Sequence, residues 1–130
     1  MQDRPSYDEL LAAVEHFLDT EIVPNVPGSR GFHARVAANA IRIVRRELAN
    51  DEDQLAAEWS GLDTVLGPAE RPAGREELRS ALRERNEALC ALVRDGEADE
   101  GEPARKLFEH VQRTVRDKLT VTDPALLDRS

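Results

Sequence analysis

Cysteine and long apolar runs are scarce in this sequence of 130 residues. Its one cysteine, Cys90, cannot form an intramolecular disulfide, so a disulfide-stapled fold is excluded. No apolar stretch approaches the roughly 18 residues that suggest a membrane span. The opening residues also lack the basic start and apolar run of a signal peptide. We therefore expect a soluble protein located in the cytoplasm.

A cationic surface is also lacking overall, because the net charge is −8. This balance argues against general nucleic-acid binding, which needs positive charge to displace phosphate counterions. The charge is nevertheless uneven, since residues 30–50 hold five arginines against Glu47 alone, between two acidic segments. Such a cationic helix is expected either to pair with its acidic neighbours or to bind an external anion.

Helical spacing of apolar residues recurs five times, whereas alternation typical of a strand occurs only at residues 119–121. The length suits one domain with one core, so we predict a single domain over residues 1–130. The predicted fold is all-α, an antiparallel helical bundle of about five helices joined by short loops.

Capping and stop signals set the expected helix bounds. Ser6 followed by Glu9 is a capping box, and Asp51 followed by Gln54 is a second one. The expected helices are residues 6–22, 31–49, 51–66, 75–94 and 103–119, with residues 120–130 as a C-terminal arm. Asp123-Pro124 is placed to begin a final short turn in that arm.

The apolar side of each helix is expected to face the core. On the first, second and fifth helices these sides include Tyr7, Leu10, Val14, Phe17, Phe32, Val36, Ile43, Val44, Phe108, Val111, Val115 and Leu119. Alanines in the second helix would allow close contact with a neighbouring helix.

Four charged or polar residues interrupt these apolar sides: Glu21, His33, Glu47 and Arg85. Buried charges require partners, so Arg85 is expected to pair with Glu47 or Glu21, with His33 nearby. The alternative is a small polar pocket whose carboxylates and imidazole hold a metal or perform acid–base chemistry.

Recognisable catalytic and metal-binding motifs are missing. A di-iron bundle needs Glu-x-x-His pairs, but the residues three before the histidines are Ala13, Arg30 and Leu107. Three histidines and one cysteine leave almost no ligands for structural zinc. Nucleophile, Walker and dinucleotide motifs are also absent from the sequence, so we expect no metal and no cofactor, and lean against an enzyme.

Two features of the second helix could bind a partner. The stretch from Pro27 to Gly31, with Arg30, leads into a helix start that could hold a phosphate or carboxylate. Alternatively it is an ordinary turn. A polar stripe with helical spacing, formed by Arg35, Asn39, Arg42 and Arg46, could hold an acidic surface of a partner or pair within the chain.

The segment F-H-A-R-V-A-A-N-A-I-R-I-V-R-R-E-L, residues 32–48, resembles the signature of an uncharacterised bacterial family of small proteins, a domain of unknown function. Residues 3–14, residues 86–96 and the L-T-V-T-D-P tail are similar to that family too. The resemblance implies genes beside aminoglycoside-phosphotransferase-like kinases and acyl-CoA dehydrogenases. It also directs attention to Phe32, His33, Arg35, Asn39, Arg46 and Glu47.

The leading hypothesis is therefore a non-enzymatic helical accessory protein that docks one of those enzymes, in acyl-CoA metabolism. The alternative is a small-ligand module for an acyl-CoA or another phosphorylated anion. A homodimer is a further expectation, because short bundles often leave apolar surface uncovered. The candidate binding residues are Arg30, His33, Arg35, Asn39, Arg42, Arg46, Glu47 and Arg85.

Overall fold

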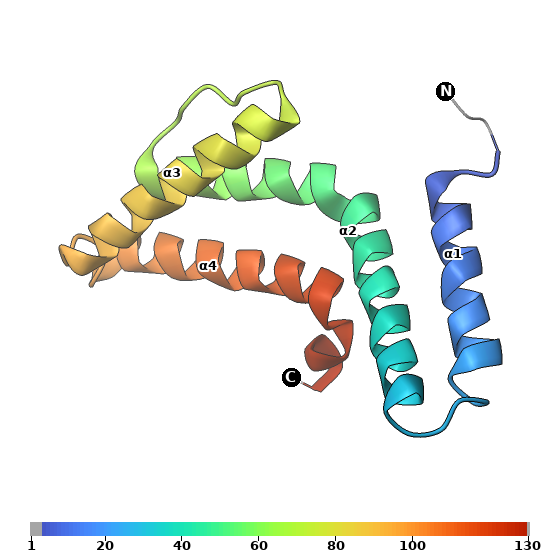
Figure 1. The fold of residues 1–130 in the computed structure, drawn as a ribbon. Helices are drawn as coiled ribbons and strands as arrows, with labels where there is room; N and C mark the ends of the chain where they lie inside the picture. Colours follow the sequence, from blue (N-terminus) through green and yellow to red (C-terminus); the bar gives the residue numbers. More distant parts are fainter. Residues whose placement is uncertain (1–3, 130) are drawn as a thin grey trace. The chain divides into compact units, whose positions relative to one another are not determined.

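A computed structural model describes residues 4–129, and every element in them is helical (Figure 1). The helices are α1 (Tyr7–Phe17), the π-helix η1 (Leu18–Ile22), α2 (Ser29–Leu66), α3 (Arg75–Arg94), α4 (Gly101–Thr122) and the 3₁₀ helix η2 (Pro124–Arg129). The described residues contain no strand, which confirms the all-α prediction. No helix among them is long and apolar enough to cross a bilayer.

The chain divides into two compact units, one of residues up to Asn50 and one of residues from Asp51 onward. The division falls inside α2. The first unit therefore contains α1, η1 and the first part of α2. The second unit contains the remainder of α2, α3, α4 and η2.

The continuity of α2 contradicts the prediction of a separate helix from Asp51. The Asp51 carboxylate is bound instead by two arginines of α3, at 2.8 Å from Arg75 and 2.5 Å from Arg79. No proline or glycine lies between Gly31 and Gly61 to interrupt the backbone hydrogen bonds. A capping-box pattern in such a stretch does not by itself start a new helix.

In the first unit, α1 begins as predicted, since the Ser6 hydroxyl accepts a hydrogen bond of 3.2 Å from the Glu9 backbone N–H. The turn before α2 and the first turn of α2 each need a glycine, for different reasons. Gly28 has a φ of 77°, and a Cβ on Gly31 would lie 1.9 Å from the Val26 carbonyl oxygen. The predicted stretch from Pro27 to Gly31 therefore comprises the end of the turn, at Pro27 and Gly28, and the first residues of α2.

The side of α2 that meets α1 consists of small and charged residues. Ala34 and Ala38 are buried, and their spacing places them on the same side as Arg42 and Arg45, which contact carboxylates of α1. The expectation that alanines allow close helix contact agrees with this burial.

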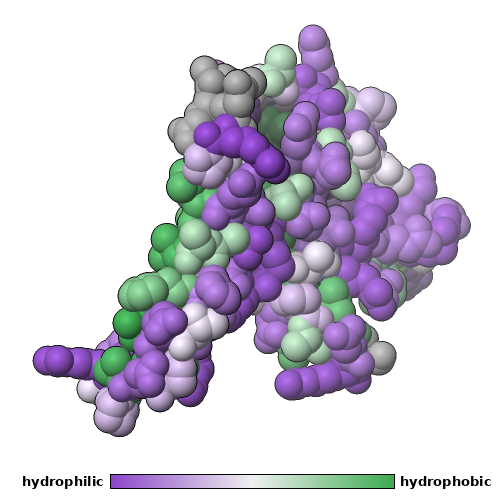
Figure 2. Space-filling model, turned by 90° about the vertical axis from the view of Figure 1, so that its right-hand side faces the viewer, coloured by the Kyte–Doolittle hydropathy of each residue, from purple (hydrophilic) through white to green (hydrophobic). Residues whose placement is uncertain are grey.

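The apolar sides of both helices in the first unit are exposed, which corrects the prediction that they are core. Tyr7, Leu10, Val14 and Phe17 of α1, and Phe32, Val36 and Val44 of α2, are between 44% and 59% exposed, while Ile43 is half-buried. Two helices can pack against each other along only one side of each. Between α1 and α2, that side is formed by alanines and ion pairs. Figure 2 views the molecule from the α1 side and shows hydrophobic side chains open on that face.

The second unit has its core where α2, α3 and α4 meet. The buried cluster is Trp59, Leu62, Leu82 and Leu89, and partly buried neighbours include Leu55, Leu78 and Leu107. The bounds predicted for the helix at residues 75–94 agree with α3. In Figure 1, α3 and α4 lie beside the second part of α2.

The side of α4 that packs on the core differs from the predicted side. Its buried side chains are His110 and Val121, whereas Phe108, Val111 and Val115, predicted to be core, are 66%, 43% and 48% exposed. The helix extends from Gly101 to Thr122, and η2 follows from Pro124. Residues 120–129, predicted as an arm, are thus mostly helical, and the Asp123 carbonyl accepts the Leu126 N–H at 3.1 Å.

Candidate functional site

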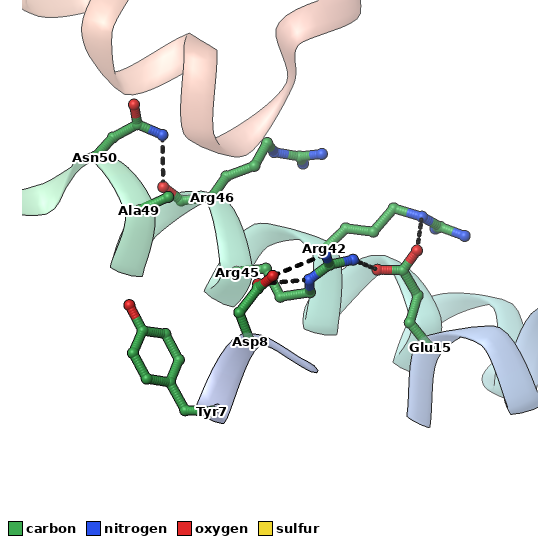
Figure 3. A pocket seen from close by; sticks show the side chains of 8 residues that line it. All are labelled: Tyr7, Asp8, Glu15, Arg42, Arg45, Arg46, Ala49 and Asn50. Carbon is green, nitrogen blue, oxygen red and sulfur yellow. Dashed lines mark hydrogen bonds and ion pairs between the residues drawn. The ribbon is translucent and has the colours of Figure 1, made fainter. Parts of the chain in front are cut away.

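An open cleft of about 480 Å³ lies between α1 and the first part of α2 (Figure 3). Its lining is mostly charged and polar, and consists of Tyr7, Asp8, Glu15, Arg42, Arg45, Arg46, Ala49 and Asn50. The cleft therefore brings together two arginines of the predicted stripe, Arg42 and Arg46, with carboxylates of α1.

Arg45 is the centre of this cleft. Its Nε lies 2.8 Å from one carboxylate oxygen of Asp8 and its Nη2 lies 3.2 Å from the other, so the Asp8 contact is bidentate. Its Nη1 donates to Glu15 at 2.9 Å. Figure 3 shows the guanidinium lying between these two carboxylates.

Arg42, one turn earlier on α2, continues the same arrangement. Its Nε lies 3.3 Å from Glu15, and its Nη2 is bound to Asp19 of η1. Glu15 thus links the two arginines. We call Asp8, Glu15, Asp19, Arg42 and Arg45 the ion-pair network; it joins α1 and η1 to α2.

The network fixes the charges of its members. The Arg45 hydrogen bond lowers the pKa of Asp8 below its ordinary value. Hydrogen bonds to Asp8 and Glu15 raise the pKa of Arg45, and the bond to Asp19 raises the pKa of Arg42. A general acid or base needs a pKa near the working pH, and these shifts move Asp8 and both arginines away from it.

The network thus serves structure more readily than acid–base chemistry. The described residues also contain no group of three or more histidine, cysteine, aspartate or glutamate side chains arranged to hold a metal ion. Arg46 lines the cleft, and its guanidinium points away from the Asp8 carboxylate (Figure 3).

A different face of α2 carries uncommitted groups. Phe32, Arg35, Val36 and Asn39 are all exposed, and their spacing of three, four and seven residues puts them on one side of the helix. We call these four residues the Phe32 face. Within residues 4–129, Arg35 forms no ion pair, and the side-chain amide of Asn39 forms no hydrogen bond. The predicted polar stripe is therefore divided: Arg35 and Asn39 are available, and Arg42 is paired.

Three of the polar residues predicted to lie in a core are exposed instead. Glu21, His33 and Glu47 are on the surface of the first unit. The His33 imidazole contacts the Phe32 ring edge-on, with centroids 5.6 Å apart and planes at 67°. Arg30 is likewise exposed, at the start of α2. The predicted buried pairing is wrong for these residues, because the apolar side on which they lie is itself solvent-exposed.

Arg85 is inward-facing on α3, and its ion-pair partner is neither Glu47 nor Glu21. Its side chain is 13% exposed and lies 2.7 Å from Asp63. It also donates to the Gly67 carbonyl at 2.8 Å, and its guanidinium lies 4.5 Å from the centroid of the Trp59 ring. Arg85 therefore ties the end of α2 to α3.

His110 of α4 is a buried polar residue that the sequence did not single out as one. It is 4% exposed, and its Nδ1 has no hydrogen-bond partner among the described residues. Desolvation lowers the pKa of its imidazole; the nearby Arg113 and Lys118 act in the same direction, and Glu58 opposes them. The signal for its burial is its spacing of three residues from Leu107, which packs on the core cluster.

Arg45 was also missed, although it makes the most contacts in the cleft. Helical spacing could have indicated its position, because Arg45 lies eleven residues after Ala34 and seven after Ala38. It is therefore on the side of α2 that is buried. The apolar pattern of α2 points to a different side of the helix from the one that packs.

Comparison with known proteins gives one family. A family model described as "Domain of unknown function (DUF6285)" matches residues 24–126, which include α2, α3 and α4. Residues 3–14, part of the resemblance found in the sequence, lie outside this match. No curated protein and no solved structure matches the chain.

Proposed function

The chain belongs to the DUF6285 family of unknown function, and we propose that it is a helical accessory protein that docks onto an enzyme without catalysis of its own. The docking surface in this proposal is the Phe32 face of α2. The partner is a protein whose surface combines an apolar patch with a carboxylate.

The observation that carries the proposal is the composition of the Phe32 face. Phe32 and Val36 are 59% and 50% exposed, so their burial in a complex would be favourable. Arg35 and Asn39 lie among them without partners in the described chain. Arginine and aromatic residues are the side chains most often found at the energetic centre of protein interfaces.

The side of α2 that holds Arg42 and Arg45 is a poorer docking surface than the Phe32 face. Arg42 and Arg45 are equally cationic, but their guanidinium groups already hold three carboxylates of the chain. Because the chain has a net charge of −8, it disfavours binding of an acidic partner except at a cation that has no partner in the described chain, such as Arg35. Arg35 is placed to select that partner, and its pairing would set the orientation of the complex.

The family resemblance suggests which partners to test first. It favours an aminoglycoside-phosphotransferase-like kinase or an acyl-CoA dehydrogenase, which would connect the chain to acyl-CoA metabolism. We propose these two enzyme classes as the first partners to test.

The experiment is co-purification and calorimetric titration of the chain with a purified kinase and a purified dehydrogenase of these classes. Arg35→Glu should weaken binding at least about tenfold, equivalent to about 1.4 kcal/mol. The matched control is Arg83→Glu, because Arg83 is an exposed arginine of α3 and the charge change is identical. Arg83→Glu should bind as the wild type does.

Two results would contradict the proposal. Absence of binding to both enzymes would remove the assignment to acyl-CoA metabolism. Equal affinity of wild type and Arg35→Glu for a partner that does bind would remove the Phe32 face as the docking surface. Arg35→Glu should not disturb folding, because Arg35 makes no ion pair within residues 4–129.

A further inference from the structure

The apolar side of α4 faces away from the core of its own unit. The core side of the helix holds Leu107, His110 and Val121, while Phe108, at 66% exposure, is the most exposed large hydrophobic residue described. Val111 and Val115 follow Phe108 at helical spacing and are 43% and 48% exposed. An apolar row of this kind on a helix surface is typical of an interaction site.

The row forms one wall of a groove. Leu126 and Leu127 of η2 form another, and the groove has a volume of about 330 Å³. Gln112, Arg116 and Leu119 complete its lining. Arg116 makes no ion pair with any residue from 4 to 129, so its charge is unmatched at the rim of an apolar surface.

The charges beside this row match those of a second copy of the same helix. Glu109, Gln112 and Arg116 are spaced by three and four residues and therefore share one flank of the row. When two identical helices pack antiparallel about a two-fold axis, equivalent flanks meet. An axis near Gln112 places Glu109 of each copy opposite Arg116 of the other.

Glu109 is available for this contact. Its present partner is Arg105, at 2.8 Å on the same exposed helix surface. Such exposed pairs one turn apart are weak, so Glu109 can share its carboxylate with a second arginine.

We propose that the chain forms a symmetric homodimer in which α4 packs antiparallel against α4 of a second copy. Phe108, Val111 and Val115 form the apolar centre of the interface, and two equivalent Arg116–Glu109 pairs set its register. This interface uses residues of α4, none of which belongs to the Phe32 face of the proposed function.

The test is sedimentation equilibrium of the full chain with two single charge reversals. The wild type should be a dimer. Arg116→Glu places two carboxylates opposite each other, and Glu109→Arg places two guanidinium groups opposite each other, so each variant alone should shift to monomer. The control, Lys106→Glu, reverses an exposed charge outside the groove and should stay dimeric.

An equimolar mixture of the two variants provides the decisive arm. In a mixed dimer, the carboxylate introduced by Arg116→Glu in one chain faces the guanidinium introduced by Glu109→Arg in the other. The second pair in that dimer is a native one, between the unchanged Glu109 of the first chain and the unchanged Arg116 of the second. The mixture should therefore recover the dimer mass. A wild-type monomer, variants that remain dimeric alone, or a mixture that stays monomeric would each overturn the proposal.

Discussion

Gly61 of α2 lies directly against the His110 imidazole of α4. A Cβ added at position 61 would lie 2.1 Å from Nδ1 of His110 and 2.7 Å from a guanidinium nitrogen of Arg113. Gly61 is buried, and the absence of a side chain there is what allows α2 and α4 to approach at this point. The glycine and the buried histidine are thus one structural feature of the second unit.

Gly61→Ala should destabilise the second unit even though alanine is the better helix former. The propensity gain is about 1 kcal/mol. Overpacking against an imidazole typically costs about 1–3 kcal/mol, so we expect a net loss of stability in urea denaturation. Ser60→Ala, at an exposed neighbouring position, is the control and should have little effect. A Gly61→Ala variant more stable than the wild type would show that the helices do not approach so closely.

The stability of the second unit should fall as the pH falls below neutrality. The pKa of His110 is below its ordinary value of 6.5 because burial disfavours the imidazolium. The unfolded chain therefore binds more protons than the folded chain below about pH 6.5, and protonation favours unfolding. His110→Gln should lessen the decrease in the urea midpoint between pH 7.5 and about 5.5, and the exposed His33→Gln should not. An unchanged pH dependence in His110→Gln would refute this role.

The ion-pair network should hold α1 against α2. Arg45→Ala removes the guanidinium between Asp8 and Glu15 and leaves two carboxylates facing the cleft without it. We expect faster hydrogen exchange in α1, with less effect in high salt, where the native ion pairs are already screened. Arg35→Ala removes an uncommitted arginine of the same helix and is the control. Identical exchange in the two variants would mean that the apolar contacts alone hold α1.

Local sequence signals locate the helices well where neighbouring residues decide them. Ser6 and Glu9 form the predicted cap of α1, and the bounds of α3 agree with the prediction. Local signals failed at Asp51, because its carboxylate is bound by Arg75 and Arg79, which are more than twenty residues away. A sequence pattern cannot distinguish a capping aspartate from one that pairs with another helix.

The sequence was a poorer guide to which side of a helix packs. Amphipathic spacing placed Phe32 and Phe108 in a core, but both are exposed. The sides that pack instead hold Ala38, which permits close approach, and His110, which is accommodated by Gly61. Only the arrangement of neighbouring helices determines these choices. Arg85 illustrates the same limit, since its spacing places it among apolar residues of α3 but does not identify its partner, Asp63.

Arg85 should be replaceable by lysine only with a loss of stability. Its planar guanidinium donates to Asp63 and to the Gly67 carbonyl while it stacks on Trp59, and an ammonium group cannot make all three contacts. We expect Arg85→Lys to lower the free energy of unfolding by about 1–2 kcal/mol. Trp59 is the only tryptophan, so its fluorescence reports this site during unfolding. Arg83→Lys is the control, and an equal effect of both substitutions would argue against the stacking contribution.

The docking proposal is tested most directly by hydroxyl-radical footprinting of the chain, free and in complex with a purified kinase or dehydrogenase partner. Labelling of Phe32 should fall in the complex, while labelling of Cys90, an exposed residue of α3, should be unchanged. Unchanged labelling of Phe32 in a saturated complex would contradict docking through the Phe32 face.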